Sequence, residues 1–164
     1  MKKLLLLALG LCLFAIPSRA QSADASISYS YFRLGNSGGL NQNGGSGSIG
    51  YYPIHFLGFV GDFGAYHASP SGVSTNTVTY LFGPRLILRN PLRINPFAQA
   101  LFGGSRVSIS GTASNQFAFS FGGGVDIGML PHLYLRPQVD YVGLRNAGQT
   151  LNCTRASVGV AIRF

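Results

Sequence analysis

Charged residues are scarce in this chain of 164 residues, and acidic ones most of all. Lys, Arg, Asp and Glu together make up 10% of the sequence, and its four acidic residues are all Asp. A soluble domain of this size carries about 25% charged residues. This shortage argues against an outer surface that is covered by water. It suits a protein whose outer surface faces lipid.

The chain also lacks a hydrophobic run long enough to cross a bilayer as a helix. The longest run, 4–16, has 13 residues, whereas a transmembrane helix needs about 20. Two lysines precede the run, and a proline and small residues follow it, which is the pattern of a secretory signal peptide. We predict that residues 1–20 are a signal peptide cleaved after Ala20, and that residues 21–164 form one domain.

Three further absences narrow the function. Without the signal peptide the chain has nine Arg, four Asp and no Lys, which gives a net charge of +5 and no basic cluster for a nucleic acid. Only Cys153 remains, so an intramolecular disulfide cannot form. No His or Cys spacing typical of a metal site occurs, and we expect neither a metal nor another cofactor.

Alternation of apolar and polar residues is what the chain has in abundance. In residues 155–164 every even position is apolar and the odd positions are polar or small, the period of a β-strand with one apolar face. Eight such segments are predicted as strands, at 23–32, 45–52, 57–67, 76–89, 94–106, 115–129, 133–144 and 150–164. Most reach the 9–11 residues that a tilted transmembrane strand needs.

The predicted connections alternate between short and long. Short segments that contain Pro lie at 53–56, 90–93 and 130–132, and longer segments rich in Gly, Ser and Asn lie at 34–44, 68–75, 107–114 and 145–148. Short periplasmic turns and longer external loops are typical of a transmembrane barrel, which also satisfies every backbone polar group in lipid. The sequence therefore predicts an all-β fold, an eight-stranded antiparallel up-and-down transmembrane β-barrel. Pro84 and Pro137 conflict with mid-strand positions, and a bulge at each is one explanation.

Charged residues of the predicted strands share the polar face. This predicted interior charge network comprises Asp62, Arg85, Asp126, Arg136, Asp140, Arg155 and Arg163. An eight-stranded barrel is only wide enough to be filled by its own side chains, and an unpaired charge there is costly. We therefore expect Asp–Arg pairs that fill the lumen. A narrow ion path gated by the same pairs is the alternative.

Several segments resemble the small outer-membrane protein β-barrel domain family, the OmpA-like barrels. The most specific segments are 58–67, 80–85, 96–104, 122–127 and 135–141, and the resemblance covers the whole chain after the signal peptide. It implies the barrel fold and a place in the bacterial outer membrane. It implies little about activity, because such barrels serve as anchors, adhesins, narrow pores and enzymes. Since the sequence ends in the last strand, we expect no periplasmic tether to the cell wall.

The resemblance also implies partners. In such barrels the terminal aromatic residue, here Phe164, faces lipid, and the end of its strand is read by the barrel assembly machinery. Arg33, Arg106 and Arg145 each lie where a predicted strand meets an external loop, at the height of the phosphates of the outer leaflet. We expect contacts with outer-membrane lipid and lipopolysaccharide through these arginines. Ordinary solvated surface charge is the alternative.

A lipid-modifying enzyme is the third functional hypothesis. Some eight-stranded barrels cut or transfer acyl chains with a Ser/His pair that an acid orients. Only His67 lies near the outer rim, with Ser69 two residues later, while the Asp residues are assigned to the interior. We therefore expect a non-enzymatic integral outer-membrane protein with a structural or surface-interaction role through its loops. A narrow low-conductance channel is the alternative.

Overall fold

The computed structural model describes residues 22–35, 40–69, 75–109, 112–146 and 149–164. The predicted signal peptide, residues 1–20, lies outside the described residues. Within the described part of the chain, no helix is long and apolar enough to span a membrane.

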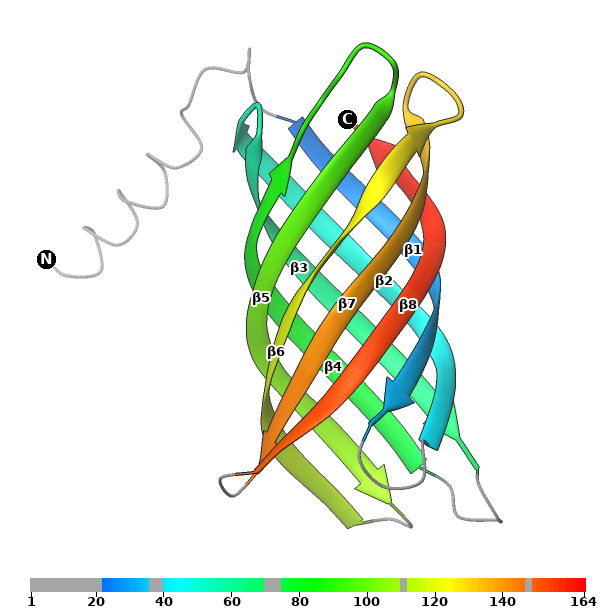
Figure 1. The fold of residues 1–164 in the computed structure, drawn as a ribbon, viewed down its shortest axis with the longest axis vertical. Coiled ribbons are helices and arrows are strands. Elements are labelled where there is room, and N and C mark those ends of the chain that lie inside the picture. The colour runs from blue at the N-terminus through cyan, green and yellow to red at the C-terminus, as the bar shows by residue number, and fades with distance from the viewer. Residues whose placement is uncertain (1–21, 36–39, 70–74, 110–111, 147–148) are drawn as a thin grey trace, which may run out of the picture.

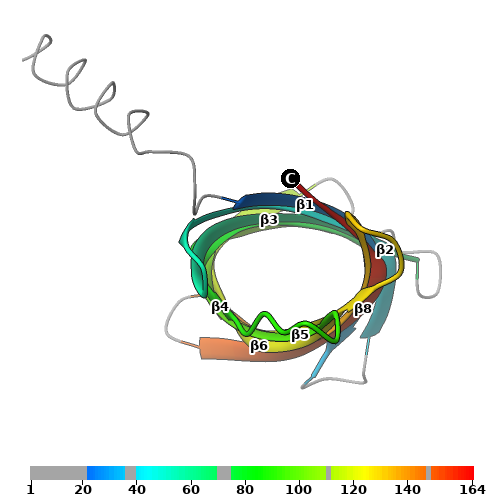
Figure 2. The same cartoon turned by 90° about the horizontal axis from the view of Figure 1, so that it is seen from above.

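Eight antiparallel strands form a closed barrel in which each strand pairs with its sequence neighbours and the last pairs with the first (Figures 1 and 2). The strands are β1 (Ser22–Leu34), β2 (Leu40–Ile54), β3 (Leu57–Ala68), β4 (Thr75–Ile87), β5 (Ile94–Ile109), β6 (Thr112–Gly128), β7 (Leu133–Asn146) and β8 (Gln149–Arg163). The predicted fold class is confirmed. The start of β1 and the end of β8 lie at the same end of the barrel as the β2–β3, β4–β5 and β6–β7 connections (Figure 1). The predicted alternation of short and long connections is not reproduced, because the β4–β5 connection, 88–93, is longer than the β5–β6 and β7–β8 connections at the opposite end, 110–111 and 147–148.

The strands reach further toward the opposite end than predicted. β2 already pairs with β1 at Leu40, and β5 pairs with β6 as far as Ile109, so much of the segments 34–44 and 107–114 is strand rather than loop. The sequence assigned these segments to loops because they are rich in Gly, Ser and Asn. Their backbone groups nevertheless continue the hydrogen-bonded ladder, which does not depend on side-chain type.

Neither mid-strand proline marks a bulge. The β4–β5 pairing is interrupted at Pro84 but has the same register on both sides, with Phe82 opposite Phe102 and Arg85 opposite Gln99. The β6–β7 pairing likewise keeps its register across Pro137. A proline removes one N–H and therefore one ladder bond, which requires no inserted residue. A register shift does occur between Tyr51 and Ile54, beside the first short turn.

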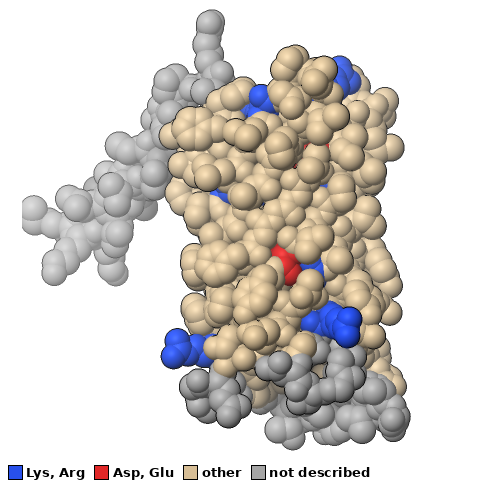
Figure 3. Space-filling model, in the orientation of Figure 1, with Lys and Arg blue, Asp and Glu red and all other residues tan. Residues whose placement is uncertain are grey.

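The two faces of the wall have opposite chemistry. Along β4, Val78, Tyr80 and Phe82 are exposed, while the residues between them are buried in the lumen. Large apolar side chains also point outward on the other strands. Ile27 on β1, for example, is 75% exposed. Figure 3 shows a wall composed mainly of uncharged residues, with basic side chains mostly toward the two ends. A continuous apolar surface of this kind matches lipid rather than water.

Candidate functional site

The half of the lumen nearest the two chain termini holds a first ion-paired cluster around Arg136. Its Nε lies 2.6 Å from Asp126 Oδ1, and its Nη2 lies 2.9 Å from Asp24 Oδ2. Arg163 Nη2 also binds Asp126, at 2.9 Å. Arg89 lies just beyond the end of β4, where burial, and after it the positive charge of Arg163, lowers the pKa of its guanidinium. The cluster joins side chains from strands that are distant in sequence.

A second cluster surrounds Arg155 near the middle of the lumen. Arg155 Nη1 lies 2.6 Å from Asp62 Oδ1, and its Nη2 lies 2.8 Å from Asp140 Oδ2. The same guanidinium donates to the hydroxyl of Tyr66 at 3.1 Å. Arg155 is 1% exposed, so its charge is balanced by protein groups and not by water.

Gln99 connects the two clusters. Its Oε1 accepts from Arg85 Nη2 at 2.7 Å, and its Nε2 donates to Asp140 Oδ1 at 3.0 Å. Arg85 in turn lies 3.8 Å from Asp24. The result is one network with four Asp and four Arg, so the formal charges cancel.

All seven residues predicted for the interior charge network lie in it. Asp24 belongs to it too and was missed, although it shares its parity with Ser26 and Ser28, the polar positions of the same predicted segment. Tyr52 was missed as well, and its hydroxyl donates to Asp24 Oδ2 at 2.9 Å. The alternation of inward and outward positions along each strand could have identified both Asp24 and Tyr52 as interior residues.

The outer half of the lumen is filled differently, by a cluster of apolar side chains beside buried uncharged polar residues such as Gln42, Thr77 and Ser105. This outer cluster comprises Phe32, Val60, Tyr66, Leu81, Leu101, Ala118, Val142, Leu144 and Cys153. Phe32 and Tyr66 stack with their ring centroids 4.8 Å apart. Leu81 and Leu101 are fully buried. Cys153 is a buried free thiol.

Comparisons with known proteins agree with this geometry. The family model described as "Outer membrane protein beta-barrel domain" matches residues 4–164. The chain belongs to this family. It is therefore an integral protein of the bacterial outer membrane. The end of the barrel that carries both termini is called the periplasmic end, as is typical of such barrels, and the opposite end is called the outer end. No curated protein gives a significant match.

Solved structures share the fold at low sequence identity. Neisserial surface protein A is 18% identical, with a TM-score of 0.70, over 88% of this chain and 97% of that one. Ail, the attachment invasion locus protein of Yersinia pestis, in complex with a heparin analogue, is 16% identical, with a TM-score of 0.62, over 88% and 99%. The β-barrel domain of Pseudomonas aeruginosa OprF is 17% identical, with a TM-score of 0.61, over 86% and 97%.

The outer rim of the barrel carries exposed basic and aromatic side chains. Arg33, Arg106 and Arg145 are all exposed, on β1, β5 and β7. Tyr31 and Tyr141, 40% and 42% exposed, lie close to two of them. In outer-membrane barrels, aromatic residues gather at the membrane interfaces. The three arginines lie toward the ends of their strands opposite the chain termini.

The histidines occupy both ends of the barrel. His132 lies in a periplasmic turn, where its Nδ1 is 3.0 Å from the carbonyl oxygen of Arg163. At the outer rim, His67 Nε2 lies 2.9 Å from Ser69 Oγ, and its Nδ1 lies 2.6 Å from Asn76 Oδ1. Asn76 was not singled out in the sequence. Among the described residues, no group of three His, Cys, Asp or Glu is placed to hold a metal ion.

Proposed function

We propose that the barrel is a closed scaffold with a structural or surface-interaction role, and that its lumen neither conducts ions nor catalyses a reaction. The filled lumen is the observation that carries this proposal. Every carboxylate of the interior charge network is engaged by an arginine, and in the outer half Leu81 and Leu101 are fully buried. A permeating ion would have to displace both the ion-paired side chains and the apolar side chains. This requirement distinguishes the closed scaffold from a narrow channel gated by ion pairs alone.

The extended strand ends change where a surface interaction would take place. Since β1, β2, β5 and β6 continue beyond the predicted loop boundaries, their outer ends supply much of the surface that faces the exterior. Arg33 and Arg106 lie on these strand ends. We further propose that Arg33, Arg106 and Arg145 contact lipopolysaccharide, because arginine binds phosphate through paired, charge-assisted hydrogen bonds. Phe164, at the end of the closing strand, remains the proposed signal for the assembly machinery.

Conductance in planar bilayers tests the closed lumen. We expect no single-channel events from the folded wild type. We expect Leu101→Gly, which shortens a fully buried lumen side chain, to produce brief openings, and Leu86→Gly, a change on the exposed face of β4, to produce none. Steady conductance by the wild type would overturn the closed-scaffold proposal and favour the channel. If Asp126→Ala conducts while Leu101→Gly does not, the ion pairs rather than the apolar cluster form the barrier.

A further inference from the structure

The outer rim at β3 and β4 carries a hydrogen-bonded chain of three side chains that the closed scaffold does not use. Ser69 Oγ lies 2.9 Å from His67 Nε2, and His67 Nδ1 lies 2.6 Å from Asn76 Oδ1. All three side chains are exposed. A nucleophile, a base within reach of it and a third group that orients the base make up the arrangement of serine hydrolases.

The contact with Asn76 favours one tautomer of the imidazole. The amide oxygen of Asn76 can only accept, so we assign the hydrogen to His67 Nδ1, which donates it. In the neutral ring, Nε2 is then left with a lone pair that faces the hydroxyl of Ser69. This is the tautomer that a general base needs. The sequence argument against an enzyme looked for an acid as the third group, and an amide oxygen fills the same position.

Strand geometry explains why these residues meet. His67 on β3 is directly opposite Asn76 on β4. Both residues point outward, and Ser69, one residue past the end of β3, is exposed beside them. Through Asn43, the register also connects His67 to Tyr31, one of the interfacial tyrosines. The three side chains therefore lie on the outside of the wall, near the polar boundary of the membrane.

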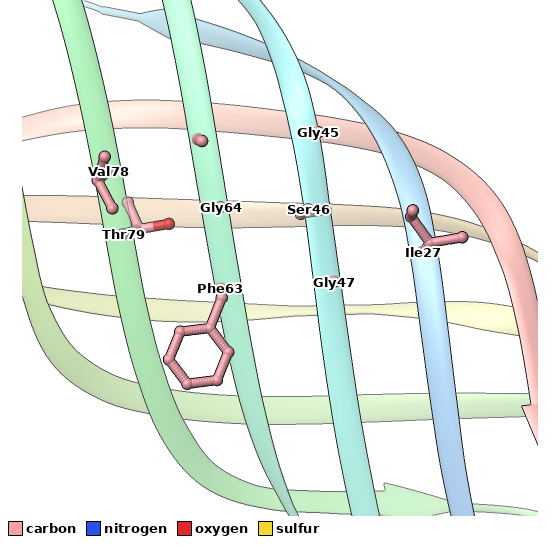
Figure 4. A pocket seen from close by; sticks show the side chains of 9 residues that line it. Ile27, Gly45, Ser46, Gly47, Phe63, Gly64, Val78 and Thr79 are labelled. Atoms are coloured by element: carbon pink, nitrogen blue, oxygen red, sulfur yellow. The ribbon is translucent and has the colours of Figure 1, made fainter.

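An apolar groove begins at the next outward position toward the periplasm. It is lined by Ile27, Gly45, Ser46, Gly47, Phe63, Gly64, Ala65, Val78 and Thr79, with a volume of about 360 Å³. Ala65 and Val78 are the outward neighbours of His67 and Asn76 on their strands and face each other. Figure 4 shows Ile27 and Phe63 on either side of a stretch of β2 where Gly45 and Gly47 have no side chain.

We propose that Ser69, His67 and Asn76 form a site that hydrolyses an acyl ester of a membrane lipid whose chain lies in this groove. The groove faces the hydrocarbon region, so an acyl chain is the occupant that its surroundings supply. The groove positions the acyl chain but adds little binding free energy, because lipid tails are as apolar as the wall. Arg106, exposed and directly opposite Val78 on β5, supplies a cation for an anionic headgroup beside the ester.

The reaction balances as hydrolysis by one water molecule. Ser69 Oγ attacks the ester carbonyl carbon and its proton passes to His67 Nε2. The bond from that carbon to the alcohol oxygen breaks, and His67 returns the proton to the departing alkoxide, which leaves an acyl-Ser69 ester. Water then attacks this ester and gives a proton to His67, and the proton returns to Ser69 Oγ as the fatty acid leaves. Asn76 is a positioning residue that holds the imidazole.

Purified full-length protein, folded in detergent as judged by the heat-modifiable gel shift, provides the test. We expect it to react with a fluorophosphonate probe, with the adduct mapped to Ser69 by mass spectrometry, and to cleave p-nitrophenyl acyl esters. Ser69→Ala should abolish both reactions, and His67→Ala should lower kcat by roughly 10²–10⁴-fold. The control Ser114→Ala changes an exposed serine at the same end of β6 and should have no effect. A folded wild type that neither reacts with the probe nor cleaves the esters would overturn the proposal.

Two further variants separate positioning and chain binding from folding. Asn76→Ala should lower kcat with little change in KM, and Asn76→Asp should restore it, which a purely structural role would not predict. Gly45→Leu fills the groove without a backbone clash, because a Cβ there lies 3.9 Å from the nearest heavy atom, the carbonyl oxygen of Ser28. We expect it to reduce cleavage of long-chain esters and to spare butyrate esters. Equal loss for both chain lengths would refute the groove as the acyl site.

A comparison of two vesicle preparations identifies the lipid that supplies the ester. Vesicles of phospholipid alone and vesicles that contain lipopolysaccharide are incubated with wild type and with Ser69→Ala, and released fatty acids are measured. Release that depends on Ser69 from either preparation supports the proposal and identifies the lipid. If neither preparation releases fatty acid, the site does not act on membrane lipid. The outcome is independent of the conductance assay, so it and the closed-scaffold proposal can fail separately.

Discussion

The two halves of the lumen are filled by opposite means. From the periplasmic end to the middle, the lumen holds four Asp and four Arg in one network joined by Gln99, and the outer half holds apolar side chains around the stacked rings of Phe32 and Tyr66. The ionic half depends on complete pairing, since one lost partner leaves a buried charge. The apolar half depends on volume, since one lost side chain leaves only a cavity. Damage to the two halves should therefore differ in size.

The largest effect is expected from Arg155→Ala. This change leaves both Asp62 and Asp140 without the guanidinium that pairs with them at 2.6 and 2.8 Å. Breaking a buried ion pair typically costs about 3–5 kcal/mol. We expect a lower free energy of unfolding in urea and a lower temperature for the loss of the heat-modifiable gel shift.

Two variants sharpen this experiment. Arg145→Ala, an exposed arginine on the neighbouring β7, is the matched control and should leave the transition in place. The triple variant Arg155→Met, Asp62→Asn, Asp140→Asn removes the charges together and should recover much of the lost stability. If Arg155→Ala unfolds at the same urea concentration as the wild type, the pairs are not essential and the contrast between the halves fails.

A smaller effect is expected in the apolar half from Leu101→Ala. The side chain is fully buried in the outer cluster, and such truncations cost about 2–5 kcal/mol, depending on how far the cavity collapses. Cys153, in the same cluster, reports whether the filling loosens. Its thiol should resist maleimide in the folded wild type and react faster in Leu101→Ala. A thiol that reacts at once in the folded wild type would show that the outer half admits water.

The alternation of inward and outward residues along each strand was sufficient to predict part of this architecture. It assigned the apolar and polar faces and placed seven charged residues inside, because the period of a strand is fixed by its backbone. It could not assign partners, since Arg155 and Asp62 meet across the lumen from β8 and β3, and that encounter depends on the stagger of the closed barrel. The outer strand ends were too short in the prediction; residues 40–44 of β2, for example, read Leu-Asn-Gln-Asn-Gly and give no apolar alternation.

The site at the rim shows the same limit. His67 and Ser69 share a face by parity alone, but Asn76 joins them only through the β3–β4 register. Sequence spacing did not fix that register, because the prediction treated 68–75 as a loop of free geometry. A search for a third group among acids alone also excluded the amide that the structure places there. Side chains brought together by neighbouring strands therefore need the register before their chemistry can be judged.

The smallest effect on stability is expected at the outer rim, because the arginines there are exposed. Arg33, Arg106 and Arg145 are exposed, so the triple change to Gln should alter the free energy of unfolding by about 0.5 kcal/mol or less. Co-purification of lipopolysaccharide should nevertheless decrease and become less sensitive to salt, because phosphate contacts of this kind are screened. Arg93→Gln, an exposed arginine in a periplasmic turn, is the control and should bind as the wild type does. Equal lipopolysaccharide on wild type and triple variant at matched folding would leave the rim arginines as solvated charge. A large decrease in the free energy of unfolding would instead show that these arginines stabilise the barrel, as the lumen arginines do.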